Sequence, residues 1–337
     1  MFRRDDELAV GPARRPPKPW VVAAAIGLAI VIAGGLWAVL SAGGSNPRGR
    51  TQVELALPRF SRLDPARSGD PALIERGASG PLPMVANDGR KAWQAYARPF
   101  DRNDSRPRIA IVIANLGQAR AETEAAIAKL PGAVTLGFNP YAPDLPGWVE
   151  KARAAGHELI IGVPMEPLDY PRQDPGPETL LLSLSPKQNL ERLEWSLSRA
   201  SGYVGVTNFM GSRFTAASAE LRPILEVVKG RGLLFLETRV SNQSAVPALA
   251  DEFALPHAAN DRDLDAEGSR TGIDQALAEL EGIARKRGGA VGTGSGYPAT
   301  IERVAAWAAT LDGKGLALAP LSALVAMQAG LAKEAGK

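Results

Sequence analysis

The chain has 337 residues, of which 45% are hydrophobic and 22% are charged. Its 39 basic and 36 acidic residues nearly cancel to a net charge of +3, which excludes the strongly basic surface typical of nucleic-acid-binding proteins. With no cysteine and only two histidines, it cannot form disulfides, thiolate metal sites or a thiol nucleophile, and it is poorly supplied with imidazoles for zinc.

The first predicted element is an uncharged apolar stretch, Val21–Leu40. At 1.5 Å per residue, a helix over this stretch is long enough to cross a hydrocarbon core of roughly 30 Å. Basic residues before it (Arg3, Arg4, Arg14, Arg15 and Lys18) favour an inside N-terminus. We predict a cytoplasmic tail at 1–19, a transmembrane helix at 20–40 in a bacterial inner membrane, and a periplasmic C-terminal domain.

A cleaved signal peptide is the alternative for this stretch. The apolar run is long for one, the segment before it is long and contains proline, and Leu40-Ser41-Ala42 lacks the small residue expected two positions before a cleavage site. Residues 41–105, which contain Gly43, Gly44 and Pro47 followed by scattered prolines and charges, are predicted to form a flexible linker. A short apolar piece, Ala92–Tyr96, could dock on the domain.

From Arg106 the pattern becomes alternating strands and helices. Short β-type runs are expected at Ile109–Ile113, Val134–Phe138, Leu159–Val163, Tyr203–Val206, Leu233–Leu236, Ala290–Val291 and Leu316–Leu321. Helices are expected between them at Ala119–Leu130, Leu145–Ala155, Ser185–Ala200 (with a capping box of Ser185 and Gln188), Ser218–Lys229, Ala248–Phe253, Thr271–Arg287 and Pro298–Leu311. This alternation predicts an α/β fold, a distorted (β/α) barrel of about seven parallel strands over 106–332.

Polar residues gather where the expected strands end, which is where α/β folds place their sites. Tyr203–Thr215 has the sequence Y-V-G-V-T-N-F-M-G-S-R-F-T. It closely resembles a motif of the divergent polysaccharide deacetylase family, usually G-V-N-N-H-M-G-S-R-F-T. Further short matches follow the family's order: Arg108–Gly117, Gly156-His157-Glu158, Pro164-Met165-Glu166-Pro167, Phe235–Arg239, Asp261–Asp265 and Gly296–Thr300.

The resemblance covers about Arg106 to Val325 and implies a distorted (β/α) barrel of the polysaccharide deacetylase type. It also implies a metal-dependent hydrolase that removes acetyl groups from envelope or extracellular glycans. In that chemistry an aspartate and histidines hold a divalent metal such as zinc, and the metal polarises the amide carbonyl and activates a water.

The sequence departs from the family where the metal would bind. The family's I-D-D-x-G is here Ile113-Ala114-Asn115-Leu116-Gly117, and Gly162, Phe209 and Tyr297 stand where the family has histidines. The family's D-S-R-T is here Glu237-Thr238-Arg239-Val240. Alanine, glycine and phenylalanine have no side-chain ligand atoms. We therefore expect no metal cofactor, and regard any enzyme activity as uncertain.

The polar residues that remain form a degenerate pocket, and none is a confident catalytic residue. Acid–base work by two of its carboxylates is one interpretation, and a structural ion-pair network with the arginines is the favoured one. Phe209 and Tyr297 either fill the space of the lost metal or stack on sugar rings. The candidates are Asn115, Glu166, Asn208, Ser212, Arg213, Glu237, Arg239, Asp263, Asp265 and Tyr297.

Three functions are compatible with these features. The first is a membrane-anchored pseudoenzyme of the cell envelope that binds envelope glycan or an envelope protein. The second is an active deacetylase with a rearranged site built from Asn115, Glu166, Glu237, Asp263 and Asp265. The third is a structural or interaction protein with no glycan role. Tightly bound zinc would distinguish the second from the first, and glycan pull-down would distinguish the first from the third.

Overall fold

The computed structural model describes residues 69–239 and 241–335, with side chains to residue 328. The predicted tail, transmembrane helix and first part of the linker lie outside the described residues. Within the described part of the chain, no helix combines the length and apolarity needed to span a bilayer.

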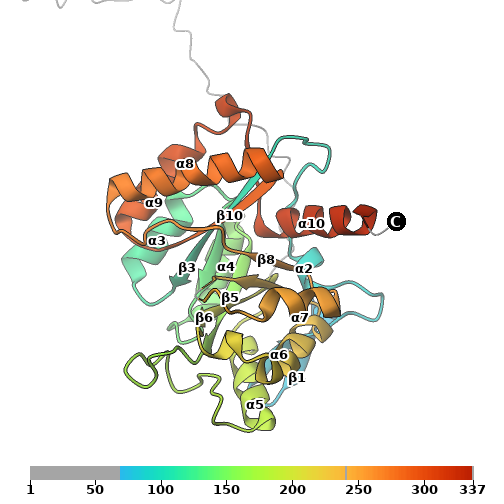
Figure 1. Cartoon of the computed structure of the whole chain (residues 1–337). Helices are drawn as coiled ribbons and strands as arrows, with labels where there is room; N and C mark the ends of the chain where they lie inside the picture. Colours follow the sequence, from blue (N-terminus) through green and yellow to red (C-terminus); the bar gives the residue numbers. More distant parts are fainter. Residues whose placement is uncertain (1–68, 240, 336–337) are drawn as a thin grey trace, which may run out of the picture. The chain divides into compact units, whose positions relative to one another are not determined.

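A curled sheet of parallel strands forms the centre of the unit, with helices packed around it (Figure 1). The strand order is β8-β7-β6-β5-β4-β3-β10-β9, and β11 pairs with the start of β3. Every pairing along this order is parallel. The strands are β3 (Arg108–Leu116), β4 (Thr135–Phe138), β5 (Leu159–Met165), β6 (Gly205–Met210), β7 (Leu234–Glu237), β8 (His257–Ala259), β9 (Arg262–Asp263), β10 (Gly289–Ser295) and β11 (Ala317–Leu318).

The two ends of this sheet meet in one short segment. Residues 257–259 pair with β7, and residues 262–263 of the same segment pair with β10. Between them, the amide of Asn260 donates to the carbonyl of Glu237 (2.8 Å) and the amide of Asp261 donates to the carbonyl of Val291 (2.8 Å). The expected α/β architecture is therefore confirmed as a curled parallel sheet, consistent with a barrel.

Connecting helices cover the outside of the sheet, because each crosses over between parallel strands and needs to bury one apolar face. In Figure 1, α3, α8 and α9 lie on one side of the strands, and α5, α6 and α7 lie on the other. Strands buried on both faces are continuously apolar, and all seven residues of β5 are buried. The helices are α3 (Arg120–Lys129), α4 (Leu145–Ala154), α5 (Pro186–Leu197), α6 (Ser218–Gly230), α7 (Val246–Phe253), α8 (Arg270–Arg287), α9 (Pro298–Ala308) and α10 (Leu321–Ala335).

Most predicted elements appear within a few residues of their expected bounds, including the Ser185–Gln188 capping box at the start of α5. The expected final strand Leu316–Leu321 is reduced to Ala317–Leu318, because Leu321 already begins α10. The sequence patterns missed β8 and β9, which are too short to show alternation, and α10.

Residues 69–105 differ from the expected flexible linker. They form a 3-10 turn (Pro71–Leu73), the antiparallel hairpin β1 (Ile74–Gly77) and β2 (Gly80–Pro83), and α2 (Ala92–Ala95). Tyr96 is 2% exposed, and its carbonyl accepts a hydrogen bond from Arg153 Nη1 (2.6 Å). Arg231 donates to Glu75 Oε1 (2.7 Å) and to the Pro83 carbonyl (3.0 Å). Residues 69–105 are therefore part of the folded unit, and we call them the N-terminal arm.

Candidate functional site

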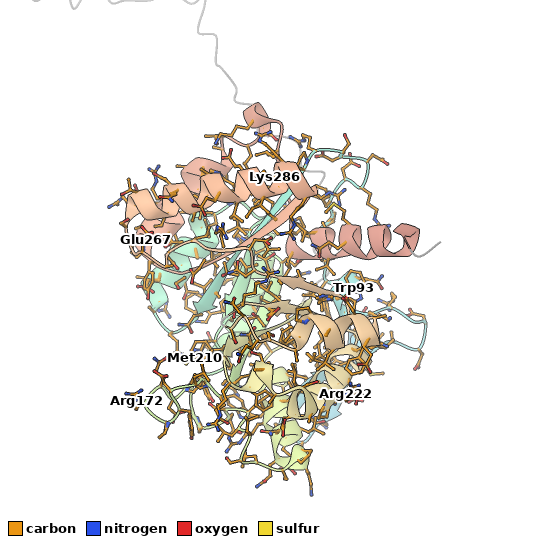
Figure 2. All side chains as sticks on the ribbon, viewed as in Figure 1. Trp93, Arg172, Met210, Arg222, Glu267 and Lys286 are labelled. Atoms are coloured by element: carbon orange, nitrogen blue, oxygen red, sulfur yellow. The ribbon has the colours of Figure 1, made fainter. Side chains whose placement is uncertain are left out.

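The carboxyl ends of β3, β5, β6, β9 and β10 form one end of the sheet, which we call the mouth. In Figure 2, Arg172, Met210 and Glu267, each of which follows or ends one of these strands, lie on the same side of the view. Trp93, in the N-terminal arm, lies on the opposite side of the view.

Strand register shows which residues face the interior of the sheet. A Cβ on Gly292 would lie 2.4 Å from Leu280 Cδ1 of α8, so Gly292 faces the helices. Its neighbour Thr293 therefore faces the interior, because successive residues alternate. Following the parallel pairings around the sheet puts Asp263, Gly162, Thr207 and Phe209 on the interior face, and puts Asn208 and Glu237 on the helix-facing side.

Gly162 and Phe209 are neighbours at the mouth. A Cβ on Gly162 would lie 3.5 Å from Phe209 Cβ and 3.7 Å from Pro140 Cδ. The half-buried Phe209 and the glycine thus share the space in which the family's histidines would project. Tyr297 follows β10 and is 56% exposed, so its ring extends into solvent at the rim.

Asn115, the residue before the last one of β3, has the left-handed conformation (φ 59°) and lies at a register shift between β3 and β4. Its Oδ1 accepts a hydrogen bond from Asn139 Nδ2 (2.8 Å), and Asn139 Oδ1 accepts from the amide of Tyr141 (2.8 Å). This amide pair ties the ends of β3 and β4 together. Two neutral amides are weak substitutes for the carboxylates that hold a divalent metal.

Glu166 is a buried structural residue. Its Oε1 accepts from Arg213 Nη1 (2.9 Å) and its Oε2 accepts from the amide of Leu182 (2.6 Å). Its carbonyl accepts from the amides of Arg213 and Phe214 (3.1 Å each), and Ser212 Oγ accepts from the amide of Leu168 (3.0 Å). This set joins the loops after β5 and β6.

The carboxyl ends of β6 and β7 are joined through Asn208. Its Nδ2 donates to Thr238 Oγ1 and to the Met210 carbonyl (2.7 Å each), and its Oδ1 accepts from the amide of Thr238 (3.0 Å). Arg239 follows in the left-handed conformation (φ 51°) and is exposed. Glu237 is 2% exposed, and its carboxylate forms no hydrogen bond with the described residues.

Asp263 and Asp265 supply the acidic part of the mouth. Asp265 Oδ2 accepts from the amide of Ser295 (2.7 Å) and from Thr300 Oγ1 (2.8 Å), which fixes its position beside β10. Partial desolvation, and then the nearby charge of Asp265, raise the pKa of Asp263. Of the predicted site residues, Asp263 alone combines an interior-facing carboxylate with a perturbed pKa.

The residues present do not fit the family's metal. Among residues 69–239 and 241–335, no group of three or more His, Asp or Glu side chains is arranged to hold a metal ion. His157 is buried, with Nδ1 2.8 Å from the Val134 carbonyl and Nε2 3.2 Å from the Ile127 carbonyl. His257 lies beside Leu255 and Asp251 on the α7 side. Neither imidazole reaches the mouth.

A pocket of about 350 Å³ lies beside α5, and no sequence pattern predicted it. Part of it was visible as the helical spacing of Gln188, Glu191, Arg192 and Trp195, but nothing in the sequence placed the β1–β2 turn next to that helix face. Its lining consists of Ser79, Glu178, Leu184, Gln188, Glu191, Arg192 and Trp195.

Comparison with known proteins supports the family resemblance. The model of the divergent polysaccharide deacetylase family matches residues 111–325. A crystal structure of an uncharacterized protein from Agrobacterium tumefaciens C58, ATU2773, is 37% identical with a TM-score of 0.71, covering 73% of this chain and 99% of that one.

Two curated relatives are more distant. An uncharacterized protein of Haemophilus influenzae is 26% identical over 194 residues, which is 58% of this chain and 68% of that protein. Uncharacterized protein YibQ of Escherichia coli is 26% identical over 204 residues, and the match spans 60% of its length. The family match covers most of the sheet and its helices, and the chain belongs to the divergent polysaccharide deacetylase family.

Proposed function

We propose that this chain is a non-catalytic member of its family, anchored in the bacterial inner membrane by residues 20–40, whose periplasmic domain binds envelope glycan. The supporting observation is the contact between Gly162 and Phe209. Both lie on the interior face of the neighbouring strands β5 and β6, and neither has a side-chain ligand atom. A Cβ on Gly162 would lie 3.5 Å from Phe209 Cβ, so the Phe209 side chain starts beside the position from which a side chain at 162 would project.

The other polar groups at the mouth are already engaged with protein partners. Glu166 is bound by Arg213 and Leu182, Asp265 by Ser295 and Thr300, and Asn115 by Asn139. A metal would have to displace these hydrogen bonds, each of which contributes on the order of 1 kcal/mol. The mouth is therefore poorly suited to metal-assisted hydrolysis.

The test uses the full-length chain, purified in detergent and treated with a chelator. We expect less than stoichiometric zinc after metal reconstitution, no acetate release from acetylated chitooligosaccharide above background, and retention on peptidoglycan or on acetylated chitooligosaccharide beads. One tightly held zinc per chain would contradict the non-catalytic proposal. Failure to bind both glycans would favour a structural or protein-binding role instead.

An active hydrolase with a rearranged site is the second candidate, and the raised pKa of Asp263 beside Asp265 favours it. Such a pair of carboxylates can share a proton and perform acid–base catalysis. Acetate release that is lost in Asp263→Asn, but retained in the exposed-acid control Glu267→Gln, would establish this alternative.

A further inference from the structure

The end of the sheet opposite the mouth, where the strands begin, is called here the amino end. Each connecting helix runs back against the strands, so its last turn and the link to the next strand lie at this end. The N-terminal arm lies there as well. The Trp93 amide donates to the Gly232 carbonyl just before β7 (3.0 Å), and the Arg98 amide donates to Glu158 Oε2 just before β5 (3.1 Å). In Figure 2, Trp93 lies across the view from Met210, which ends β6.

The amino end and the mouth carry opposite charge, which the net charge of only +3 for the whole chain conceals. The segments at the amino end contain 17 Lys and Arg residues and 10 Asp and Glu residues, and Asp261 and Glu281 also reach it, to pair with Arg287 (2.8 Å) and Lys314 (2.5 Å). The segments at the mouth contain 7 Lys and Arg residues and 11 Asp and Glu residues. The formal charge is therefore +5 at the amino end and −4 at the mouth. The segments at the amino end are 69–108, 129–134, 151–158, 194–204, 227–233, 250–256, 285–288 and 309–316, and those at the mouth are 117–123, 139–148, 166–188, 211–221, 237–249, 262–273 and 296–301.

Five exposed basic side chains at the amino end form no hydrogen bond, ion pair or ring contact with the described residues. Two exposed acids at this end, Asp101 and Asp251, also lack a Lys or Arg partner there, and the other exposed acids are paired with arginines. The surplus of charge is therefore presented to solvent rather than neutralised inside the protein. The five basic residues are Arg76, Lys91, Arg102, Lys229 and Lys286.

Helix dipoles explain only part of this surplus. A cation in the last turn of a helix is favourable, which fits Lys229 of α6 and Lys286 of α8. The arm residues have no such position, because Arg76 lies in β1 and Lys91 precedes α2, where the dipole favours an anion. Like charges gathered on one face repel one another, so an anionic partner outside the chain would stabilise this arrangement.

The membrane of the proposed function offers such an anionic surface to the amino end. The chain enters the described unit at residue 69, in the arm, and 28 residues (41–68) separate it from the proposed helix at 20–40. Those 28 residues span at most about 100 Å, so the bilayer is always within reach of the domain. Anionic headgroups attract clustered Lys and Arg side chains, and each such side chain close to the surface strengthens binding roughly fivefold.

We propose that the amino end docks on anionic phospholipid headgroups through Arg76, Lys91, Arg102, Lys229 and Lys286. This inference rests on the membrane anchor of the proposed function and adds a second, electrostatic contact with the same bilayer. The acidic mouth then faces away from the anionic surface, which repels it, and toward the envelope glycan.

The experiment reconstitutes the full-length chain in vesicles of equimolar phosphatidylglycerol and phosphatidylcholine, or of phosphatidylcholine alone. Because the chain has no cysteine, one fluorophore can be attached at Gly313→Cys, an open position at the amino end, or at Gln173→Cys, an exposed position in the loop after β5. Energy transfer to a headgroup-labelled lipid reports which end is nearer the bilayer. In anionic vesicles we expect more transfer at 313 than at 173, and we expect this difference to shrink in neutral vesicles and at high salt.

The triple variant K91Q/K229Q/K286Q should lower the ratio of docked to undocked domains at least about tenfold. The matched control R120Q/R172Q/R270Q removes three exposed cations on the mouth side and should dock as wild type. Equal transfer at the two positions in anionic vesicles would overturn the proposal. So would a difference that persists in the amino-end variant or in neutral vesicles. Circular dichroism of each variant confirms that it is folded.

Alkaline carbonate washing tests the anchor separately, because it removes proteins held at a membrane only by charge. Extraction of the wild-type chain would overturn the proposed anchor. Sedimentation of such a chain with anionic but not neutral vesicles would still support the docking surface, and its failure to sediment with either would overturn both.

Discussion

Replacing Glu166 by alanine tests whether the acidic residues of the mouth hold the structure together. The Glu166 side chain is 6% exposed, whereas that of its ion-pair partner Arg213 is 51% exposed. The variant leaves the Leu182 amide without its acceptor and removes the ion pair. If glutamate at this position instead serves catalysis, removing it should leave stability unchanged or raise it, as is common at strained functional sites.

The expected cost follows from the two contacts. An orphaned, partly buried amide costs about 1–3 kcal/mol, and an ion pair whose arginine is half exposed contributes about 0–1 kcal/mol after solvent screening. Glu166→Ala should therefore lower the free energy of unfolding by about 1–4 kcal/mol, or roughly 2–16 °C in Tm. Arg213→Ala should cost only about 1 kcal/mol, because water can replace the guanidinium on the solvent side.

Urea unfolding followed by far-UV circular dichroism measures both variants. The exposed pair of Arg222 and Glu252 (2.6 Å, side chains 40% and 54% exposed) provides the control, and Glu252→Ala should leave the urea midpoint close to that of wild type, because solvent screens an exposed ion pair. Our reasoning is refuted if Glu166→Ala costs no more than Glu252→Ala, or if Arg213→Ala costs as much as Glu166→Ala.

Three further predictions concern the fold. A fragment covering 106–337 should have a free energy of unfolding in urea that is lower by about 5 kcal/mol or more than that of a fragment covering 69–337, because it loses the buried apolar side chains of the N-terminal arm. Equal urea midpoints would show that the arm does not contribute to stability. Gly211→Ala should cost at least about 2 kcal/mol, since φ is 92° and the added Cβ lies 2.7 Å from a methionine Cβ, while Gly230→Ala, with open space around it, should be neutral or slightly stabilising. Burial lowers the pKa of His157, and hydrogen bonds to carbonyls partly offset this. The unfolded state therefore binds the proton more readily than the folded state. The stability contributed by neutral His157 is present above about pH 6.5 and declines as the pH falls. Thermal melts between pH 7 and pH 5 should accordingly show a smaller loss of stability for His157→Gln than for wild type.

The alternating pattern predicted most of the sheet because buried parallel strands and amphipathic helices differ clearly in period and length. It failed where local signals are weak. The arm was assigned to a linker because prolines and charges dominate residues 69–105, although Tyr96 is buried by contacts with residues far along the chain. Residues 257–263 showed no strand pattern, since the segment changes neighbours after three residues.

At the site, the sequence alone identified which residues follow strand ends, but it could not assign faces or partners. The sequence predicted Asn208 and Glu237 as residues of the site, but the strand register places both side chains on the face of the sheet that is covered by helices. The engagement of Glu166 with Leu182, and of Asp265 with Thr300, depends on loops whose positions no local pattern encodes. The pocket beside α5 needed the β1–β2 turn, which is distant in sequence, to complete its wall.

The segment 257–263 joins the two ends of the sheet, β7 and β10, and so limits the circumference of the sheet. An extended residue advances only about 3.4 Å, so the segment has no slack with which to bridge a wider opening. An inserted or deleted residue there would break the hydrogen bonds at one end, to β7 or to β10, and would let the strands spread. The tip of the loop after β5, where Arg172 is exposed, pairs with no strand, so a change in its length should leave the circumference of the sheet unchanged.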